Sequence, residues 1–412
     1  MDINELLRDA AARSSSDVHL KVGSPPVFRI DGQLVPQVDR KRLMQEDTIS
    51  MAFKLMDNFH KQRFKDDHEV DLAYSVPGLG RFRVNVFQQR GTVGLVLRLI
   101  PIKIRSIGEL FLPKVLERVA EETRGLILVT GTTGSGKSTT LAAMIDAINA
   151  NRTVHIVTIE DPIEYLHRDK RGLVNQREVG SDTKHFSIAL RNALRQDPDV
   201  ILVGEMRDFE TIETALTAAE TGHLVFSTLH TVDAAETINR IISVFPPYQQ
   251  KQIRLQLAGV LKAVISQRLM PRADGKGRVP AVEVMISTPL IRDCIIDEDK
   301  TRLITDSIER GLTQYGMQTF DQSLMRLLKK GLITYDDAMR WSSNPGNFKL
   351  KLSGIQSTAE LGMEDVEMKE LDSQYQPTGA ADAEAEPEAR PEKPEESADE
   401  DSIFDFSNSM YE

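Results

Sequence analysis

The sequence of 412 residues predicts an α/β protein with a smaller α+β region before its main sheet and an acidic tail after it. Three observations support this prediction. Between residues 124 and 245, apolar runs rich in β-branched residues alternate with amphipathic helical segments, as in a parallel sheet covered on both faces. The first 100 residues instead show short alternating runs separated by turn residues. From about residue 356 the hydrophobic periodicity disappears.

Residues 1–100 are predicted to form an α+β domain around a mostly antiparallel sheet. The stretch from Ser16 to Pro36 indicates two strands, and Asp31-Gly32 lies where a tight hairpin turn requires positive φ. One helix is expected over about Glu46 to Arg63. The three strand-like runs that follow are EVDLAYSV, GRFRVNVFQQR and VGLVLRLI.

Residues 101–112 are expected to be a linker, because two prolines flank a segment without clear periodicity. The next domain, residues 113–355, holds four predicted parallel strands: GLILVTG, HIVTIE, DVILVGE and HLVFSTL. Helices are expected beyond Phe245, one of them over the whole of YQQKQIRLQLAGVLKAVISQRLM, and Gly331 is expected to follow the end of another. Trp341 is interpreted as a packing residue.

Charge is distributed unevenly along the chain, whose formal net charge is −11. Residues 357–412 contain 18 acidic and 3 basic side chains, and the preceding 356 residues contain 44 acidic and 48 basic ones. The composition of residues 356–412 predicts a disordered tail. The slightly basic body lacks a stripe of aromatic and basic residues, so no nucleic-acid partner is expected.

The single cysteine, Cys294, excludes an internal disulfide framework and a multi-cysteine zinc site, and it is interpreted as a small apolar filler. The start of the chain lacks the basic and then apolar pattern of a secretion signal, and nowhere do 18 apolar residues run together. We therefore expect a soluble cytoplasmic protein that meets a membrane only through a partner.

The stretch GTTGSGKST follows a predicted strand and opens a predicted helix. Its G-x-x-x-x-G-K-[ST] spacing lets backbone N–H groups and the helix N-terminus bind phosphate oxygens. Lys137 is expected to reach the β- and γ-phosphates of ATP, and Ser138 to supply an oxygen to Mg²⁺. The expected nucleotide-binding residues are Gly131, Thr132, Thr133, Gly134, Ser135, Gly136, Lys137, Ser138 and Thr139.

Two acidic segments follow other predicted strands. In DPDVILVGEMRD the predicted strand ends near Glu205, an acid that can orient or deprotonate water. Many such hydrolases carry a metal-binding aspartate at the position of Gly204. TIEDPIEY supplies three more acids, and any of them can hold Mg²⁺ or the attacking water through hydrogen bonds. These acids are Glu160, Asp161 and Glu164.

The segment HLVFSTLHT places a histidine at each end of the next predicted strand. Parallel strands place ligands at their carboxyl ends, so His230 is the candidate that lies near the γ-phosphate. His223 begins the strand at the opposite edge, where we expect it to cap or brace the structure.

Together these four motifs resemble, in the same order, those of the secretion ATPases that drive type IV pili and type II secretion. GTTGSGKST resembles that family's Walker A loop, TIEDPIEY its Asp box, DPDVILVGEMRD its Walker B motif and GHLVFSTLHT its His box. The resemblance covers roughly residues 1–355. It implies a RecA-like P-loop NTPase core, an N-terminal PAS-like domain, a ring of six subunits, and ATP bound between the two domains.

The resemblance also implies roles for particular residues. Glu205 would be the catalytic acid, Glu164 would belong to the metal and water network with Ser138 as a second metal ligand, and His230 would lie near the γ-phosphate. Members of the family have N-terminal arginines that close over the phosphates. Similar positions in this sequence are held by Arg81, Arg83 and Arg98. Considered without the resemblance, these arginines alternate along strands and also fit a solvated face.

The single cysteine and the length before the tail distinguish branches of this family. Assembly and type II secretion ATPases typically carry a four-cysteine zinc element, whereas the ending GMQTFDQSLMRLLKKGLITYDDAM is similar to the retraction branch. The resemblance therefore implies a motor for pilus retraction at the cytoplasmic face of the inner membrane, coupled to a membrane platform protein. Two alternatives remain: an accessory retraction subunit that acts beside a paralogous ATPase, and an assembly or secretion ATPase without the zinc element.

Overall fold

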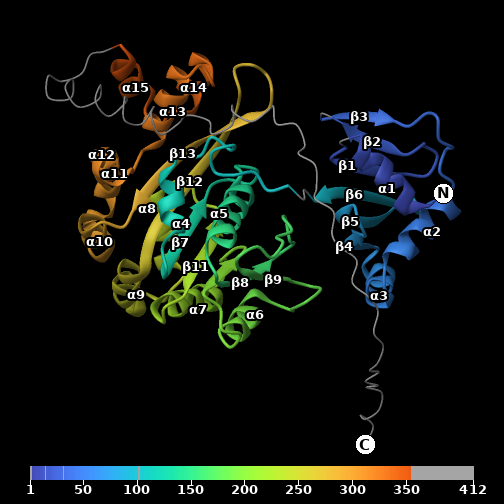
Figure 1. Ribbon diagram of the computed structural model, residues 1–412, viewed down its shortest axis with the longest axis horizontal. Coiled ribbons are helices and arrows are strands. Elements are labelled where there is room, and N and C mark those ends of the chain that lie inside the picture. Colours follow the sequence, from blue (N-terminus) through green and yellow to red (C-terminus); the bar gives the residue numbers. More distant parts are fainter. Residues whose placement is uncertain (1, 14, 31, 101–102, 354–412) are drawn as a thin grey trace, which may run out of the picture. The chain divides into compact units, whose positions relative to one another are not determined.

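The computed structural model describes residues 2–13, 15–30, 32–100 and 103–353. The expected acidic tail lies outside the described residues, as do Asp31 of the expected turn and the first two residues of the expected linker. The described residues form two sheets, one of six strands and one of seven (Figure 1).

The six-stranded sheet lies in the N-terminal part of the chain and has the strand order β3-β2-β1-β6-β5-β4, with every neighbouring pair antiparallel. Its elements are α1 (Ile3–Ala12), β1 (Asp17–Leu20), β2 (Val27–Ile30), β3 (Gln33–Pro36), α2 (Gln45–Leu55), α3 (Asn58–Asp67), β4 (Glu69–Val76), β5 (Gly80–Gln89) and β6 (Thr92–Ile100). The antiparallel α+β prediction is confirmed, but residues 16–36 form three strands, β1 to β3, where two were expected. The prediction of one helix over residues 46–63 is wrong, because Asp57 accepts a hydrogen bond from the backbone of His60 and starts α3 as a separate helix.

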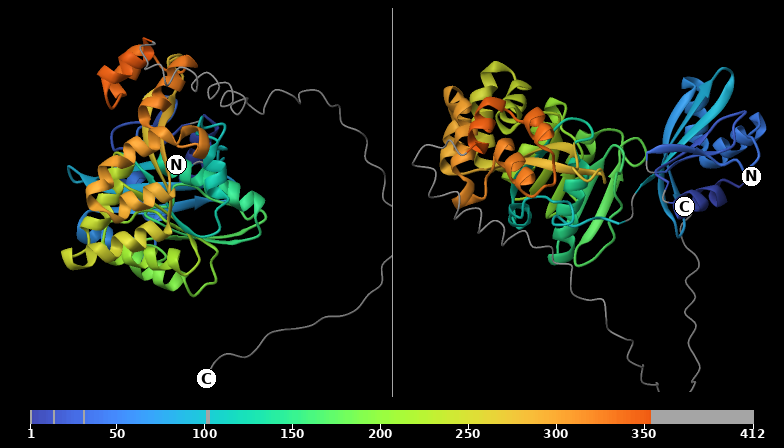
Figure 2. Two further views of the ribbon diagram at one scale, coloured as in Figure 1. Left: turned by 90° about the vertical axis from the view of Figure 1, so that its left-hand side faces the viewer. Right: turned by 90° about the horizontal axis from the view of Figure 1, so that it is seen from above.

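Two helices cover one face of this sheet (Figure 2). Leu6 and Leu7 of α1 and Met51 of α2 are buried in one cluster with Val84 of β5 and Leu97 of β6. The alternation of buried and exposed residues along β4 and β5 places one face against these helices and leaves the other more exposed.

The seven-stranded sheet has the order β13-β12-β7-β11-β10-β8-β9, and only its β12–β13 pair is antiparallel. Its elements are α4 (Val115–Ala120), β7 (Gly125–Thr130), α5 (Lys137–Asn151), β8 (His155–Glu160), β9 (Leu173–Glu178), α6 (Phe186–Ala193), β10 (Val200–Val203), α7 (Phe209–Glu220), β11 (Leu224–Leu229), α8 (Ala234–Ser243), α9 (Pro247–Val260), β12 (Leu261–Pro271) and β13 (Arg278–Ile286). The four strands predicted from apolar runs are β7, β8, β10 and β11, and their parallel arrangement is confirmed.

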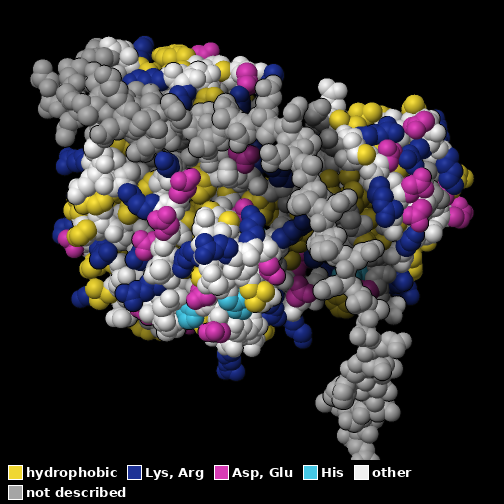
Figure 3. Space-filling model, viewed as in Figure 1, with side chains coloured by type: hydrophobic (Ala, Val, Ile, Leu, Met, Phe, Trp, Pro, Cys, Tyr) yellow, Lys and Arg dark blue, Asp and Glu magenta, His cyan; other side chains and the backbone are white. Residues whose placement is uncertain are grey.

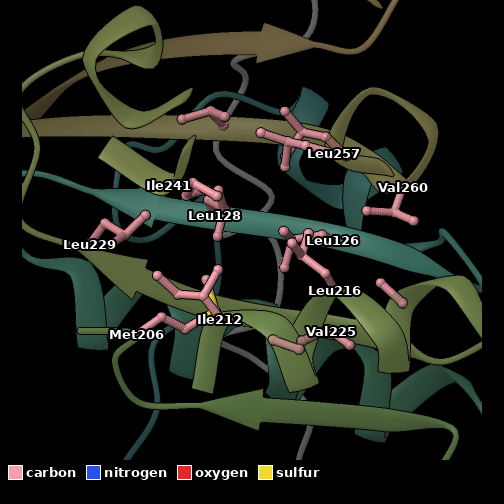
Figure 4. Packing of buried hydrophobic residues seen from close by; sticks show 14 of the residues in the cluster. Leu126, Leu128, Met206, Ile212, Leu216, Val225, Leu229, Ile241, Leu257 and Val260 are labelled. Atoms are coloured by element: carbon pink, nitrogen blue, oxygen red, sulfur yellow. The ribbon is translucent and has the colours of Figure 1, made fainter. Parts of the chain in front are cut away.

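Both faces of the seven-stranded sheet are buried, which explains the continuous apolar runs. Leu126 and Leu128 of β7 belong to a cluster with residues of α7, α8 and α9 (Figure 4). Ile127 and Val129 of the same strand point to the other face, where they join residues of α4 and α5. A strand in this position needs no polar side, so its sequence does not alternate.

The prediction of one long helix from Tyr248 to Met270 is wrong. Helix α9 ends at Val260 and strand β12 begins at Leu261 without a loop between them. β12 lies between β7 and β13. Because β12 is buried, its apolar run has the composition of a buried helix, and neither glycine nor proline separates the two elements. Strands β9 and β13 were also not predicted.

The described part of the expected linker, residues 103–112, forms neither helix nor strand but is not fully exposed. Ile107, Leu110 and Leu112 are buried in the same cluster as the helices α4 and α5. This segment therefore contributes apolar surface to the core of the seven-stranded sheet.

Helices follow the second sheet, as predicted. They are α10 (Pro289–Ile296), a 3₁₀ helix (Glu298–Leu303), α11 (Ile304–Arg310), α12 (Leu312–Tyr315), α13 (Phe320–Lys329), α14 (Tyr335–Trp341) and α15 (Pro345–Leu352). Gly331 has a φ of +67° just after α13, in the conformation that favours glycine. Trp341 packs at the edge of a buried cluster, and Cys294 is buried.

The surface of the described residues carries both signs of charge. Figure 3 shows Lys and Arg side chains interspersed with Asp and Glu on the visible face, without a large region of one sign. Within the described ranges, no helix has the length and hydropathy needed to cross a lipid bilayer.

Candidate active site

Four neighbouring parallel strands end at one edge of the seven-stranded sheet. Thr130 of β7 lies opposite Leu229 of β11, and Val203 of β10 lies opposite Ile159 of β8. The loops that leave these strands therefore start side by side. These loops hold the residues predicted from the Walker A, His box, Walker B and Asp box motifs, so the structure brings the four motifs together at one edge.

The loop after β7 is shaped by glycine. Gly131 has a φ of +139°, and a Cβ atom at this position would lie only 2.4 Å from the carbonyl oxygen of Gln267 and 2.6 Å from Ser135 Oγ. Gly134 and Gly136 also have positive φ, of +79° and +97°. The loop thus turns back on itself directly before α5, with the helix N-terminus facing the space that the loop encloses.

Two polar groups in this loop fit an anionic ligand. Lys137 is buried, and its Nζ donates to the carbonyl oxygens of Gly131 and Thr132 at 2.8 and 3.0 Å. Burial lowers the pKa of Lys137, and the charge of Glu205 partly opposes this shift. Ser135 Oγ is buried and has no hydrogen-bond partner among the described residues. Phosphate oxygens would satisfy both groups.

The Asp box is joined to the Walker A helix by a hydrogen bond. Thr139 Oγ1 and Tyr165 Oη are 2.9 Å apart. Ser138, one residue before Thr139, is exposed in the first turn of α5, and Glu164, one residue before Tyr165, is also exposed. A hydroxyl and a carboxylate are the oxygen ligands that Mg²⁺ accepts, so these two side chains fit a metal bound beside the phosphates.

The other two acids of the Asp box differ in environment. Glu160 is partly exposed as a residue, but its carboxylate accepts hydrogen bonds from Thr158 Oγ1 at 2.7 Å and from Gln176 Nε2 at 3.1 Å. Desolvation of this carboxyl raises its pKa despite these bonds. Asp161 is exposed. Glu160 is therefore committed to protein partners, whereas Asp161 and Glu164 face solvent.

Glu205 lies two residues after β10 and is held between two cationic or polar side chains. Arg207 Nε is 2.8 Å from Glu205 Oε1, and His230 Nε2 is 3.5 Å from Oε2. His230 follows the end of β11, the neighbour of β10, and this brings it beside Glu205. A carboxylate in this position can accept a proton from water.

A side chain at Gly204 would be crowded by the backbone of the neighbouring strand. A Cβ atom there would lie 3.2 Å from the carbonyl oxygen of Ile159 and 3.3 Å from Glu160 Cα. The backbone N–H of Gly204 donates to the Ile159 oxygen at 2.7 Å, so β8 and β10 approach closely at this point. Across the described part of the chain, no three His, Cys, Asp or Glu side chains form a metal-binding group.

His223 lies at the opposite edge of the sheet, as predicted. Its Nδ1 is 2.9 Å from the carbonyl oxygen of Ala218, and its own carbonyl oxygen accepts a hydrogen bond from the backbone N–H of Gly125. These contacts join the end of α7 to the starts of β11 and β7. His223 therefore braces the sheet and does not reach the P-loop edge.

Of the three predicted arginines, two have partners elsewhere in the fold. Arg98 Nε donates to the buried carboxylate of Asp17 at 2.8 Å, across the β1–β6 pair. Arg81 donates to Glu178 at the end of β9, at 3.0 Å. Arg83 is exposed and lies opposite Arg98 in the β5–β6 pair. In this structure the three arginines thus lie on neighbouring strands without a shared partner.

Sequence reasoning missed three contacts of the site. Arg207 lies in GEMRD, two residues after Glu205, and Tyr165 lies in DPIEY, directly after Glu164. This closeness in sequence to the predicted acids is the signal that points to both residues. Glu178 accepts a hydrogen bond from the backbone N–H of Ile163 at 3.1 Å and so supports the Asp box loop. No sequence pattern indicated Glu178, because β9 was not predicted.

Comparison with known proteins finds two similar pilus ATPases and a solved structure of one of this kind. The pilus retraction ATPase PilT of Pseudomonas aeruginosa is 49% identical over 348 residues, which cover 84% of this chain and all of PilT. The pilus ATPase PilU of the same organism is 42% identical over 87% of this chain and 94% of PilU. A crystal structure of the retraction motor PilT with bound ADP matches 84% of this chain and 98% of its own at a TM-score of 0.79 and 49% identity.

A family model agrees with these relatives. The model described as type II/IV secretion system protein matches residues 1–327, well over half of the sequence. The match includes both sheets and the four motifs that meet at the P-loop edge. The chain therefore belongs to the type II/IV secretion system protein family, whose members include ATPases.

Proposed function

We propose that this chain is a hexameric motor that hydrolyses ATP to ADP and phosphate and powers type IV pilus retraction. The observation that carries the proposal is the 49% identity to the retraction ATPase PilT over the whole length of PilT. A P-loop whose buried lysine and serine suit phosphate oxygens supports the ATP part of the proposal. In this proposal residues 1–100 are the PAS-like domain, 101–112 the linker and 113–355 the RecA-like ATPase domain.

In the proposed reaction, the segment 131–139 binds the phosphates through its backbone N–H groups. Lys137 pairs with the β- and γ-phosphates, and Ser138 and Glu164 would hold Mg²⁺. Mg²⁺ neutralises negative charge on the phosphates when it is bound. When phosphate binds, Lys137 gives up its hydrogen bonds to two carbonyl oxygens. It gains a charge-assisted hydrogen bond to phosphate in their place.

Glu205 is proposed to orient the attacking water and accept its proton. Its second oxygen faces His230, which can donate to the carboxylate or to the γ-phosphate. Arg207 holds the first oxygen and is itself largely exposed, so it can move without changing the fold. The water is therefore activated by a carboxylate whose position two side chains define.

The N-terminal arginines are proposed to couple hydrolysis to movement. Arg81, Arg83 and Arg98 would close over the phosphates, because guanidinium groups pair with phosphate oxygens bidentately. Loss of the terminal phosphate removes the partner of these arginines and loosens the interface between subunits. Each cycle of hydrolysis then changes the geometry of one subunit interface in the ring, and this change performs the work.

We place the ring in the cytoplasm at the inner-membrane face of the pilus machine. An inner-membrane platform protein is the proposed partner, and a paralogous retraction ATPase is a second one. Neither nucleic acid nor the lipid itself is a proposed ligand.

The test is the substitution Lys137→Ala in the strain that carries this chain, with pilus counts and surface motility as readouts. We expect many pili and no motility, because pili would be assembled but not withdrawn. Lys170→Ala is the matched control: Lys170 is an exposed lysine paired with Asp146 on α5, and the variant should retain wild-type motility. Cells without pili would contradict the proposal and indicate the assembly or secretion alternative.

An accessory role is the second candidate, because PilU is 42% identical over 94% of its length. An accessory subunit adds force beside a main motor and does not drive movement alone. The same Lys137→Ala strain distinguishes the two roles. Motility that persists while a paralogue is intact, and disappears when the paralogue is deleted, indicates the accessory role.

A further inference from the structure

A buried row of polar side chains crosses the sheet beside the P-loop. Thr130, Ser266 and Glu283 lie opposite one another on β7, β12 and β13. All three are buried, and Thr130 Oγ1 donates to Ser266 Oγ at 3.0 Å. Ser266 lies directly opposite Glu283 in the β12–β13 pair, so Glu283 continues the row. Thr130 is the residue directly before Gly131, so the row starts immediately before the P-loop.

The row ends at the helix that follows His230. The backbone N–H of Ala234, the first residue of α8, donates to Glu283 Oε1 at 2.9 Å. The loop of residues 230–233 leaves β11, and β11 is separated from β13 by β7 and β12 (Figure 1). The loop therefore crosses the carboxyl end of the P-loop strand before Glu283 holds its far end.

The loop has few residues for this crossing. Three strand spacings amount to about 14 Å, and the five steps from Leu229 to Ala234 extend to about 18 Å at most. The short loop is also joined to α8: the backbone N–H of Val232 donates to the Glu236 carboxylate at 2.8 Å, and Thr231 Oγ1 and Thr237 Oγ1 are 2.7 Å apart. The position of the α8 N-terminus is therefore passed on to His230 at the other end of the loop.

Glu283 is an unusual residue for its surroundings. Its neighbour two positions on, Met285, belongs to the apolar cluster that α7, α8 and α9 form with the sheet. Burial raises the pKa of Glu283 to about 7, with Asp233 adding to the shift and Arg268 opposing it. An apolar side chain would avoid this desolvation cost. The carboxyl group therefore serves to position the α8 N-terminus more than to stabilise the fold.

We propose that Glu283 is a positioning residue for hydrolysis, which fixes the α8 N-terminus and, through the loop 230–233, holds His230 against Glu205. The inference rests on the proposed ATPase function and assigns a residue outside the four motifs to that site. Glu283 touches neither nucleotide nor water. It acts through the backbone N–H of Ala234, and the strand pairing places it in line with Ser266 and with Thr130 of the P-loop strand.

The test compares Glu283→Leu with Glu283→Gln in the full-length protein. Leucine has a similar size but accepts no hydrogen bond, whereas glutamine can still accept from Ala234. We expect Glu283→Leu to lower kcat for ATP at least about tenfold, with KM for ATP changed less than about threefold, because a small misplacement of the site affects turnover most. Glu283→Gln should restore kcat to within about threefold of the unaltered protein.

Gln318→Leu is the matched control. Gln318 is a buried amide that donates a hydrogen bond to the carbonyl oxygen of Val282, which lies next to Glu283 on β13. Gln318 does not contact the loop 230–233. It should lower the melting temperature and leave kcat of the folded protein unchanged. The inference is overturned if Glu283→Leu keeps wild-type kcat, if Gln318→Leu lowers kcat equally, or if Glu283→Gln fails to rescue.

A second readout does not depend on activity. Amide hydrogen exchange of residues 230–238 should be faster in Glu283→Leu than in the unaltered protein and in Gln318→Leu, while exchange in β7 stays the same. Unchanged exchange in residues 230–238 would also overturn the inference. If the unaltered protein consumes no ATP, the proposed function fails, and the exchange experiment still decides whether Glu283 fixes the loop.

Discussion

Glu205 and Arg207 form an ion pair, with Arg207 Nε 2.8 Å from a carboxylate oxygen of Glu205. The arginine side chain is 71% exposed, whereas that of Glu205 is 21% exposed. The carboxylate is thus largely shielded from solvent, and the exposed arginine pairs with it from the solvent side. A substrate that displaces Arg207 would find Glu205 already positioned.

Replacing Glu205 by Ala should keep the affinity for ATP and lower turnover more than about 100-fold, the usual effect of losing a general base. Phosphate release and equilibrium binding of a fluorescent ATP analogue measure the two quantities. Glu210→Gln is the control, because Glu210 is a partly exposed acid of α7 paired with Arg191. Near-normal phosphate release by the Glu205 variant would reject the assignment.

Replacing Arg98 and Arg83 separately by Ala should distinguish binding of phosphate from structural support. We expect both variants to lose turnover at least about tenfold, since guanidinium–phosphate pairs are charge-assisted. Only Arg98→Ala should also lose stability, by about 1 kcal/mol, because Asp17 loses a partner whose side chain is two-thirds exposed. Although burial opposes ionisation of Asp17, the hydrogen bond from Arg98 holds its pKa below the usual value.

Urea unfolding and phosphate release measure these effects. Wild-type turnover in both variants would mean that the arginines form only a solvated face.

The raised pKa of Glu283 predicts a pH-dependent contribution to stability. The folded protein binds the proton of this carboxyl more tightly than the unfolded chain, so ionisation costs nothing below pH 4.5 and destabilises the fold as the pH rises towards 7. Glu283→Gln lacks this cost. Its free energy of unfolding relative to the unaltered protein should therefore rise between pH 5 and pH 8, by at most about 3 kcal/mol.

Denaturant unfolding at several pH values measures the difference between the two proteins. Asp233 and Arg268, which influence this carboxyl, are present in both. A difference that does not change with pH would contradict the buried, proton-binding state of Glu283.

Truncation after Ile355 should leave ATP turnover and the mass of the assembly unchanged. The last helix of the described core, α15, ends at Leu352, and the composition of the following residues predicts no packed core of their own. Phosphate release and light scattering measure the two properties. Loss of either would mean that the acidic tail acts on the body, whose net charge is opposite.

The sequence predicted those parts of the site that lie directly after strands. Glu205 and His230 follow buried apolar runs, and parallel strands bring their carboxyl ends to one edge, so their proximity could be inferred without coordinates. The hydrogen bond between Thr139 and Tyr165 and that between Ala234 and Glu283 could not. Each depends on the three-dimensional register of two distant segments, which no local pattern records.

The errors in the fold have a similar cause. The sequence of β12 predicts a helix because a buried helix and a buried strand both carry a continuous apolar run, and no turn residue marks the change at Leu261. Strand β13 carries Pro280, and strands with proline are mostly edge strands, which is where β13 lies. β9 is the other edge strand, and several of its side chains are only partly buried, so its apolar signal is weak.

The close contact at Gly204 also limits how this site can change over evolution. A side chain there would require the backbone of Ile159 and Glu160 to shift by a few tenths of an ångström, at the point where β8 and β10 are hydrogen-bonded. An added aspartate would therefore disturb the strand that carries Glu160. A gain in metal affinity meets less resistance in the exposed part of the Asp box, where Asp161 and Glu164 have room to vary.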